Sequence, residues 1–307
     1  MSQSDCPSLY QIDTRLWLSK LSEKISGPVT LDDVPNSELD KFHRSGFQWI
    51  WLTNIWQRGL ELREVDEAAR FAVSCYRVDD QLGGDPALHR LKKRLQDRGL
   101  KMVLDFEANH SAIDHEWIKN FPDYYVQGNE AFLTNEPGNY IKINNGSGEL
   151  ILAHGRNPFF PGWTATAQFN YGNPLLQEAM MNELVKVSGQ CDGIHCDIPV
   201  LVLPGVFEQT WGIQCKPFWP KAIGRVKENN PGFRFMCEAY WDQEGLVLQQ
   251  QGFDYTYITG DDMIVGGGLS RTSEITFIER SVIVDNANLK DLKTILINYL
   301  IPRADAC

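Results

Sequence analysis

Acidic residues stand at the ends of three short apolar runs. Asp105 lies in VLDFEANH, Asp197 ends the run DGIHCD, and Glu238 lies in RFMCEAYW. Two carboxyl groups facing each other across a cleft suit glycosidic bond cleavage, one as nucleophile and one as acid/base. An apolar setting raises the pKa of a carboxyl group, so we take Glu238 as the candidate acid/base and Asp197 as the candidate nucleophile. Taken singly, each carboxylate more often caps a helix or pairs with an arginine.

Bringing these distant residues together requires a scaffold in which the ends of several strands meet. Segments with helical spacing alternate with short apolar runs along the chain. Asp85 is expected to cap one helix with Pro86 at its first position, and Asn173 and Pro174 are expected to begin another. The expected strands are 9–12, 49–52, 102–106, 193–198, 233–239, 253–258 and 275–279.

This alternation favours a parallel α/β sheet that is covered on both faces. No GxGxxG follows the first strand, which disfavours a dinucleotide-binding fold. We expect a (β/α)₈ barrel of the TIM type, with a small domain inserted after the third strand on the active-site face. The eighth strand is not clear: 281–284 or 294–300 closes the barrel, or the barrel is truncated. The expected parts are 1–110 and 172–279 for the barrel, 111–171 for the inserted domain and 280–307 for an atypical tail.

Composition narrows the choice of partners. The 307 residues carry a net charge of −11, which argues against nucleic acid or an anionic membrane as the main partner. No apolar run is long enough to span a bilayer, and MSQSDCPSLY lacks the features of a signal peptide. The seven cysteines form no CxxC pair, so reduced thiols and a cytoplasmic location are expected. The absence of HExxH disfavours a zinc enzyme, and the oligomeric state is not determined by these features.

Several motifs together resemble those of the α-amylase family of glycoside hydrolases. GFQWIWLTNIWQ is similar to its second-strand segment, and GLKMVLDFEANHS, DGIHCDIP and FMCEAYWD are similar to its first three signature regions. The resemblance extends from about residue 10 to 279. It implies a (β/α)₈ catalytic barrel, retaining chemistry on α-glucosidic bonds and an α-linked glucosaccharide as substrate. By position, Asp197 matches the family's nucleophile and Glu238 its acid/base.

The resemblance also implies roles for residues around this pair. His110 matches the histidine that hydrogen-bonds the reacting sugar, and Tyr76 matches the tyrosine that stacks under it. Asp105 and Asn109 match residues that organise the site, and Trp241 is a further candidate for substrate contact. Because the equivalent of Asn109 ligates calcium in many members, Asn109 is a candidate calcium ligand. The reaction itself requires no cofactor.

The sequence departs from the family pattern at two points. His195 stands two residues before Asp197, where the family has an arginine; a histidine has fewer donors and could leave the aspartate with a higher pKa. The fourth region, an Asn–His–Asp motif after the seventh strand, is replaced by RSVIVDN, and no histidine follows His195. The C-terminal β-domain usual in the family is unclear or absent. Lost transition-state contacts cost several kcal/mol, so we expect activity below that of an intact member.

Three hypotheses follow. The first and favoured one is a hydrolase or transglycosylase of the α-amylase type, for which Asp197, Glu238, His110 and Tyr76 stand in register. The second is a non-catalytic relative that binds sugar or protein through the former cleft, as His195 and the missing fourth region suggest. The third is a truncated or frameshifted family member, which the change of character after Glu279 supports.

Overall fold

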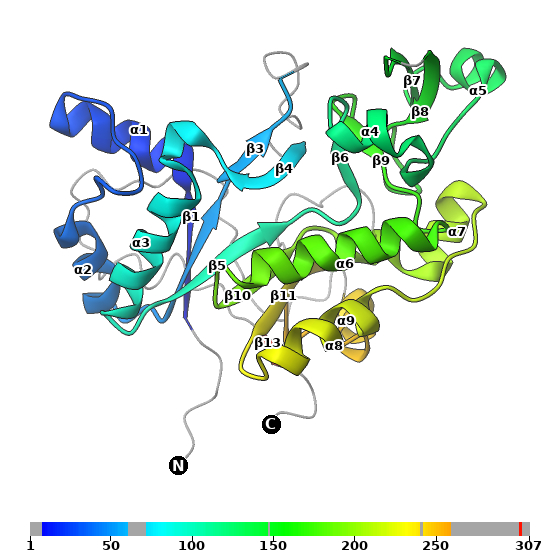
Figure 1. Cartoon of the computed structure of the whole chain (residues 1–307). Coiled ribbons are helices and arrows are strands. Elements are labelled where there is room, and N and C mark those ends of the chain that lie inside the picture. Colours follow the sequence, from blue (N-terminus) through cyan, green and yellow to red (C-terminus); the bar gives the residue numbers. More distant parts are fainter. Residues whose placement is uncertain (1–7, 61–71, 147, 240–241, 259–300, 303–307) are drawn as a thin grey trace, which may run out of the picture.

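The main sheet of the molecule follows the order of the chain. The computed structural model describes residues 8–60, 72–146, 148–239, 242–258 and 301–302 (Figure 1). The first six strands of the main sheet are parallel and the seventh is antiparallel. They are β1 (Leu9–Asp13), β2 (Trp49–Thr53), β5 (Lys101–Phe106), β10 (Gly193–Cys196), β11 (Arg234–Ala239), β12 (Tyr255–Ile258) and β13 (Ile301–Pro302).

Six expected strands are therefore present, and the described strands form an incomplete barrel. The strand expected at 275–279 and both candidates for the eighth, 281–284 and 294–300, lie outside the described residues. The strand expected at 193–198 ends earlier, at Cys196, because Ile198 has a φ of +33° and cannot continue an extended strand. Parallel strands joined by helical crossovers wind in the manner of a (β/α) barrel.

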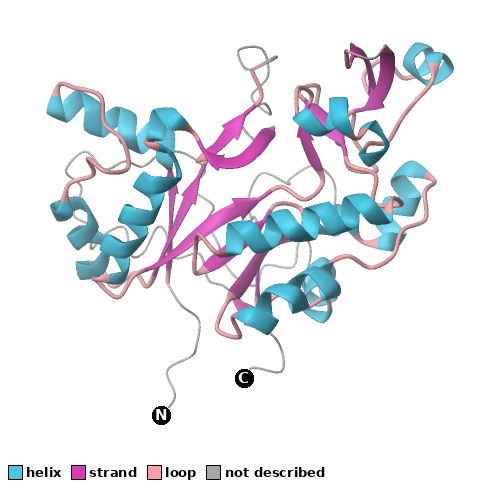
Figure 2. Cartoon of the chain, in the orientation of Figure 1, coloured by secondary structure: helices cyan, strands magenta, loops and turns pink. Residues whose placement is uncertain are grey.

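Helices join the parallel strands and cover the sheet (Figure 2). The crossovers contain α1 (Thr14–Ile25), α2 (Asn36–Arg44), η2 (Asp80–Leu82), α3 (Gly84–Gln96), α6 (Pro174–Ser188), η4 (Pro199–Val202), α7 (Pro204–Trp211), α8 (Trp219–Asn229) and α9 (Asp242–Gln250). A two-stranded antiparallel ribbon, β3 (Trp56–Arg58) and β4 (Val73–Val78), lies between β2 and α3.

The segment expected as an insertion, 111–171, has small sheets of its own. It contains α4 (Glu116–Asn120), η3 (Pro122–Tyr124), α5 (Glu130–Asn135) and the antiparallel pair β7 (Tyr140–Asn144) and β8 (Glu149–Ala153). A second pair joins β6 (His110–Ala112) to β9 (Thr166–Gln168), so the two ends of the segment meet (Figure 1). The division of the chain into separate domains stays a prediction.

The N-termini of α6 and α3 show how far local sequence determines where a helix begins. Asn173 caps α6, its side chain accepting a hydrogen bond from the Leu175 N–H at 2.9 Å, and Pro174 is the first helical residue, as predicted. The prediction that Asp85 caps α3 was wrong. The helix begins one residue before it, after Gly83 at a φ of +99°, and the Asp85 carboxylate instead accepts the Val78 N–H at 2.8 Å. This bond ties the start of α3 to β4.

The sheet presents two different faces because side chains alternate along each strand. Leu52, Leu104, Ile194 and Phe235 belong to the large core that includes the helix residues Leu88, Leu91 and Leu184. On the other face a small cluster consists of Leu9, Trp49, Trp51, Val103 and Met236. Asp105, His195 and Glu238 stand two residues beyond Val103, Gly193 and Met236, so alternation directs them to this second face.

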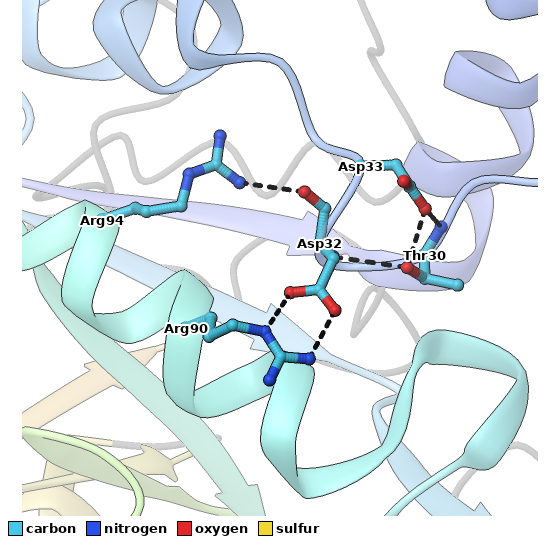
Figure 3. Close-up of polar contacts among 5 residues, drawn as sticks. All are labelled: Thr30, Asp32, Asp33, Arg90 and Arg94. Atoms are coloured by element: carbon cyan, nitrogen blue, oxygen red, sulfur yellow. Dashed lines mark hydrogen bonds and ion pairs between the residues drawn. The ribbon is translucent and has the colours of Figure 1, made fainter.

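A polar cluster on the surface fastens the α1–α2 connection to α3 (Figure 3). The Arg90 guanidinium donates to both carboxylate oxygens of Asp32, at 2.7 and 2.6 Å, and Arg94 donates to the Asp32 carbonyl at 3.3 Å. Asp33 accepts from the N–H and hydroxyl of Thr30, each at 2.8 Å. The Arg90 bonds hold the pKa of Asp32 below its ordinary value. We call these five residues the arginine cluster.

Two global expectations concern membranes and cysteines. In the part of the chain that the structure describes, no helix combines the length and apolar character needed to cross a bilayer. Cys75, Cys191, Cys196, Cys215 and Cys237 are free thiols. The cytoplasmic location stays a prediction.

Candidate active site

Three carboxyl groups stand side by side where three neighbouring strands end. Cys196 of β10 pairs with Phe106 of β5 on one side and with Cys237 of β11 on the other. The residues that follow these three are Asp197, Glu107 and Glu238. The Asp197 N–H extends the ladder by donating to the Phe106 carbonyl at 3.3 Å. The side chains of Glu107, Asp197 and Glu238 therefore leave neighbouring strands at the same level, close enough for Glu107 and Glu238 both to act on the pKa of Asp197. We call Glu107, Asp197 and Glu238 the carboxyl row.

The turn after Asp197 is strained and carries the chain away from β10. Ile198 has φ +33° and ψ 55°, a left-handed conformation that is unusual for a β-branched residue. Such a conformation costs about 1–3 kcal/mol and persists only where the surroundings enforce it. Here it directs the chain out of β10 into η4, which begins at Pro199.

Glu107 is the buried member of the row. It is 4% exposed, whereas Asp197 and Glu238 are partly exposed. Its backbone is held by Tyr76, whose hydroxyl donates to the Glu107 carbonyl and accepts from the Glu107 N–H, both at 2.9 Å. The Tyr76 ring stacks on Phe106 at a centroid distance of 5.0 Å. Tyr76 therefore fixes the position of Glu107 at the end of β5.

Asp105 and His195 lie one step deeper than the row. They are paired in the strand register, and the His195 Nδ1 lies 3.3 Å from the Asp105 Oδ1. The Trp51 indole N–H donates to the same Asp105 oxygen at 2.6 Å, and its ring lies 4.1 Å from the His195 ring. A second indole, that of Trp56, donates to the Asp105 carbonyl at 2.9 Å. Asp105 thus accepts bonds from the side chains that form the floor beneath the row.

Burial and mutual repulsion shift the protonation of the row. Burial, followed by the negative charges of Asp197 and Asp105, raises the pKa of Glu107 well above its ordinary value. Burial also raises the pKa of Asp197, but the charge of His195 and the hydrogen bond from Glu107 oppose this shift. Because the opposing contributions act on Asp197, Glu107 is the member of the pair that retains a proton more readily.

His110 and Asn109 lie next to the row in sequence but open toward the inserted segment. His110 is 5% exposed, burial lowers its pKa to about 4, and its ring lies 5.3 Å from that of Trp163. It is neutral at pH 7 and can exchange a hydrogen bond with a hydroxyl group. The Asn109 amide nitrogen lies 3.4 Å from His110 Nδ1.

The surroundings of Asn109 do not fit a calcium site. Its Oδ1 accepts a hydrogen bond from the Gln168 side chain at 3.0 Å, and its carbonyl accepts another at 2.8 Å. Calcium prefers six to eight oxygen ligands, and among the described residues no group of three or more His, Cys, Asp or Glu is placed to hold a metal ion. Calcium binding at Asn109 stays a prediction without support from these contacts, and no step below depends on it.

The structure brings most of the predicted site residues together. Asp105, His195, Asp197 and Glu238 converge at the ends of neighbouring strands, and Tyr76 reaches the row through the backbone of Glu107. Trp241 lies outside the described residues. The roles that the resemblance implies for all of them stay predictions.

Sequence reasoning missed two residues of this site, Glu107 and Trp51. Glu107 could have been found from the alternation that selects Asp105, because it is the next residue of the same parity in VLDFEANH. Trp51 gave no such signal, since an apolar run rich in tryptophan reads as core.

Comparison with known families supports this arrangement of strands. A family model described as "Alpha amylase, catalytic domain" matches residues 36–198, which include Asp105, His110 and Asp197 but not Glu238. A solved α-amylase from Geobacillus thermoleovorans, complexed with acarbose, superposes with a TM-score of 0.54 at 20% identity, covering 82% of this chain and 51% of that chain. This similarity concerns the fold.

Two curated relatives differ in kind. The rat "Amino acid transporter heavy chain SLC3A1" (Rattus norvegicus) is 25% identical over 203 residues, 62% of this chain and 28% of its own length. "Maltase 1" of Drosophila virilis is 27% identical over 157 residues, 47% of this chain and 24% of its own length. The chain spans about a quarter of these relatives, and their names include both a transporter subunit and an enzyme.

Proposed function

The chain belongs to the alpha-amylase family, and we propose that it is a retaining glycoside hydrolase or transglycosylase that acts on the α-glucosidic bonds of an oligosaccharide or glucan. The observation that carries this proposal is the strand register that makes Asp197 and Glu238 neighbours at the carboxyl ends of β10 and β11. In barrels of this kind the chemistry takes place at the carboxyl ends of the strands.

The proposed reaction has two steps. The Asp197 carboxylate attacks the anomeric carbon while Glu238 protonates the departing glycosidic oxygen, and a glycosyl–Asp197 ester forms. Glu238, now ionised, then takes a proton from water or from a sugar hydroxyl, whose oxygen attacks the same carbon and releases Asp197. Both steps use only side chains of this protein. Neutral His110 supplies a hydrogen bond to a sugar hydroxyl.

The placement of Asp197 and Glu238 bears on the type of reaction. The two residues follow paired positions of neighbouring parallel strands, and retaining enzymes likewise hold their two carboxyl groups close together, roughly 5–5.5 Å apart. Both side chains are partly exposed. The replacement of the family's arginine by His195 supports the expectation of reduced turnover.

One observation favours a second candidate function, a relative that binds sugar without cleaving it. One relative is named as an amino acid transporter heavy chain and not as an enzyme, and His195 lacks the permanent charge of the arginine that the family has at its position. A binding-only protein would hold a glucosaccharide without forming a covalent intermediate. The two functions therefore differ in whether an adduct forms.

The decisive experiment is mass spectrometry of the intact protein after incubation with 5-fluoro-α-glucosyl fluoride, which traps a retaining nucleophile. We expect one glucosyl adduct that maps to Asp197 and is lost in Asp197→Asn. Asp192→Asn is the matched control, because Asp192 lies at the opposite end of β10, where it accepts the Met102 N–H at 2.9 Å. A folded wild-type protein that gives no adduct but binds maltooligosaccharides in calorimetry would establish the binding-only function instead.

A further inference from the structure

Glu107 occupies a place in the site that the two-carboxylate reaction leaves unexplained. A third carboxyl group ends the strand beside that of the nucleophile and is only 4% exposed, and burial next to Asp197 raises its pKa. Two carboxyl groups share a hydrogen bond only when one of them holds a proton. Leaving such a group buried and ionised would be costly, so its presence requires a role or a compensating contact.

We propose that Glu107 is a positioning residue for Asp197, whose neutral carboxyl group donates a hydrogen bond that holds the nucleophile as an oriented anion. The inference rests on the proposed function in so far as Asp197 is the nucleophile.

Three contacts fix the geometry of this bond. The Tyr76 hydroxyl holds both backbone polar groups of Glu107 at 2.9 Å, so that the strand end cannot shift along its axis. The Asp197 N–H donates a hydrogen bond to the Phe106 carbonyl at 3.3 Å, and this bond keeps Asp197 level with Glu107. The side chains of Glu107 and Asp197 therefore extend from adjacent positions on neighbouring parallel strands.

The surroundings explain why a neutral donor serves here. Hydrogen bonds to a charged acceptor are about twice as strong as neutral ones. His195, which stands where an arginine would provide a permanent charge, has its Nδ1 directed to Asp105 at 3.3 Å. A neutral Glu107 donates to Asp197 without adding net charge to a row that already holds the Asp197 carboxylate. A glutamine could make the same donor contact through its amide N–H, whereas a leucine of similar size could not.

Infrared spectroscopy tests the hydrogen bond independently of catalysis. At neutral pH, wild-type protein is expected to show a C=O stretching band of protonated Glu107 beside the band of the acid Glu238, and the difference spectrum of wild type minus Glu107→Gln isolates the Glu107 band. The Glu107 band shifts in Asp197→Asn because the acceptor changes, and it is unaffected in Glu130→Gln, a control on an exposed glutamate. A difference spectrum without a protonated-carboxyl band, or a Glu107 band that Asp197→Asn leaves unchanged, overturns the proposal.

The labelling rate with the fluorosugar tests the functional part. Glu107→Leu is expected to label Asp197 about 10- to 100-fold more slowly, the range for losing a hydrogen bond to a charged group, whereas Glu107→Gln stays within a few-fold of wild type. Equal loss in both variants, with both folded, would contradict positioning by a donor. If wild-type protein forms no adduct, the proposed function fails, and the infrared bands alone decide the Glu107 contact.

Discussion

In the arginine cluster at the surface, the Asp32 carboxylate meets the guanidinium of Arg90 through two hydrogen bonds, whereas in the carboxyl row Asp197 meets two other carboxyl groups. The arginine lowers the pKa of Asp32, and burial beside other acids raises that of Glu107. The first arrangement ties a loop to a helix and satisfies its charges locally. The second places several acids together with raised pKa values, as expected of groups arranged for chemistry.

The largest difference between the arginine cluster and the carboxyl row is expected when an acid that acts in the reaction is removed. Glu238→Gln is expected to slow hydrolysis of a maltooligosaccharide by about 10²- to 10⁴-fold, the usual contribution of general acid catalysis. It should leave labelling by the glucosyl fluoride much less affected, because fluoride departs without a proton. Steady-state hydrolysis and adduct formation, measured in parallel, check this; an equal loss in both assays would remove Glu238 as the acid.

A second test makes the row resemble the arginine cluster. His195→Arg introduces a permanent charge beside Asp105 and Asp197, so the hydrogen bond from Glu107 should matter less. In this background Glu107→Leu is expected to recover about tenfold of its lost labelling rate, a coupling that a double-mutant cycle measures. His195→Gln serves as the uncharged control. Purely additive effects would mean that Glu107 and residue 195 act on Asp197 independently.

The third prediction concerns stability and pH. The folded-state pKa of Glu107 lies above its ordinary value of 4.5, so its contribution to stability is complete below about pH 4.5 and is lost as pH rises through the folded pKa. Glu107→Gln cannot titrate. Relative to the variant, the wild type should lose stability with rising pH, by about 1.36 kcal/mol for each unit of pKa displacement. Denaturant-induced unfolding of both proteins between pH 4 and 8 measures the difference in the free energy of unfolding. Parallel plots of this free energy against pH would contradict the prediction.

The arginine cluster should show the opposite sign and the smallest effect. The folded-state pKa of Asp32 lies below its ordinary value of 3.8, so its contribution is present above that pH and is lost as pH falls through the folded pKa. Asp32→Asn should therefore lose a little stability near neutrality and none in strong acid. The effect is small because the Asp32 and Arg90 side chains are 36% and 57% exposed. Activity toward the fluorosugar should not change, and a loss of labelling would show coupling across the fold.

Some sequence predictions depended on neighbouring residues in the chain, and others depended on contacts between distant segments. The helix that starts at Asn173 and Pro174 was predictable because cap, proline and apolar spacing are all local. Asp85 misled because its carboxylate is used by Val78 of β4, a contact that local sequence does not encode. Asp105, His195, Asp197 and Glu238 were predictable as strand-end polar residues with familiar motifs. Glu107 was missed although it has the same parity as Asp105, because a glutamate followed by alanine and asparagine looks like part of a loop.

The amino-acid sequence by itself determined the alternation of strands and helices, the family motifs and the acidic residues that end the strands, since each depends on neighbours in the chain. Tertiary structure alone decided which carboxyl groups touch. That depends on register between strands: Cys196 pairs with Phe106 and Cys237, and this pairing sets Asp197 between Glu107 and Glu238. A shift of one residue in either pairing would direct these side chains to opposite faces of the sheet and dissolve the row.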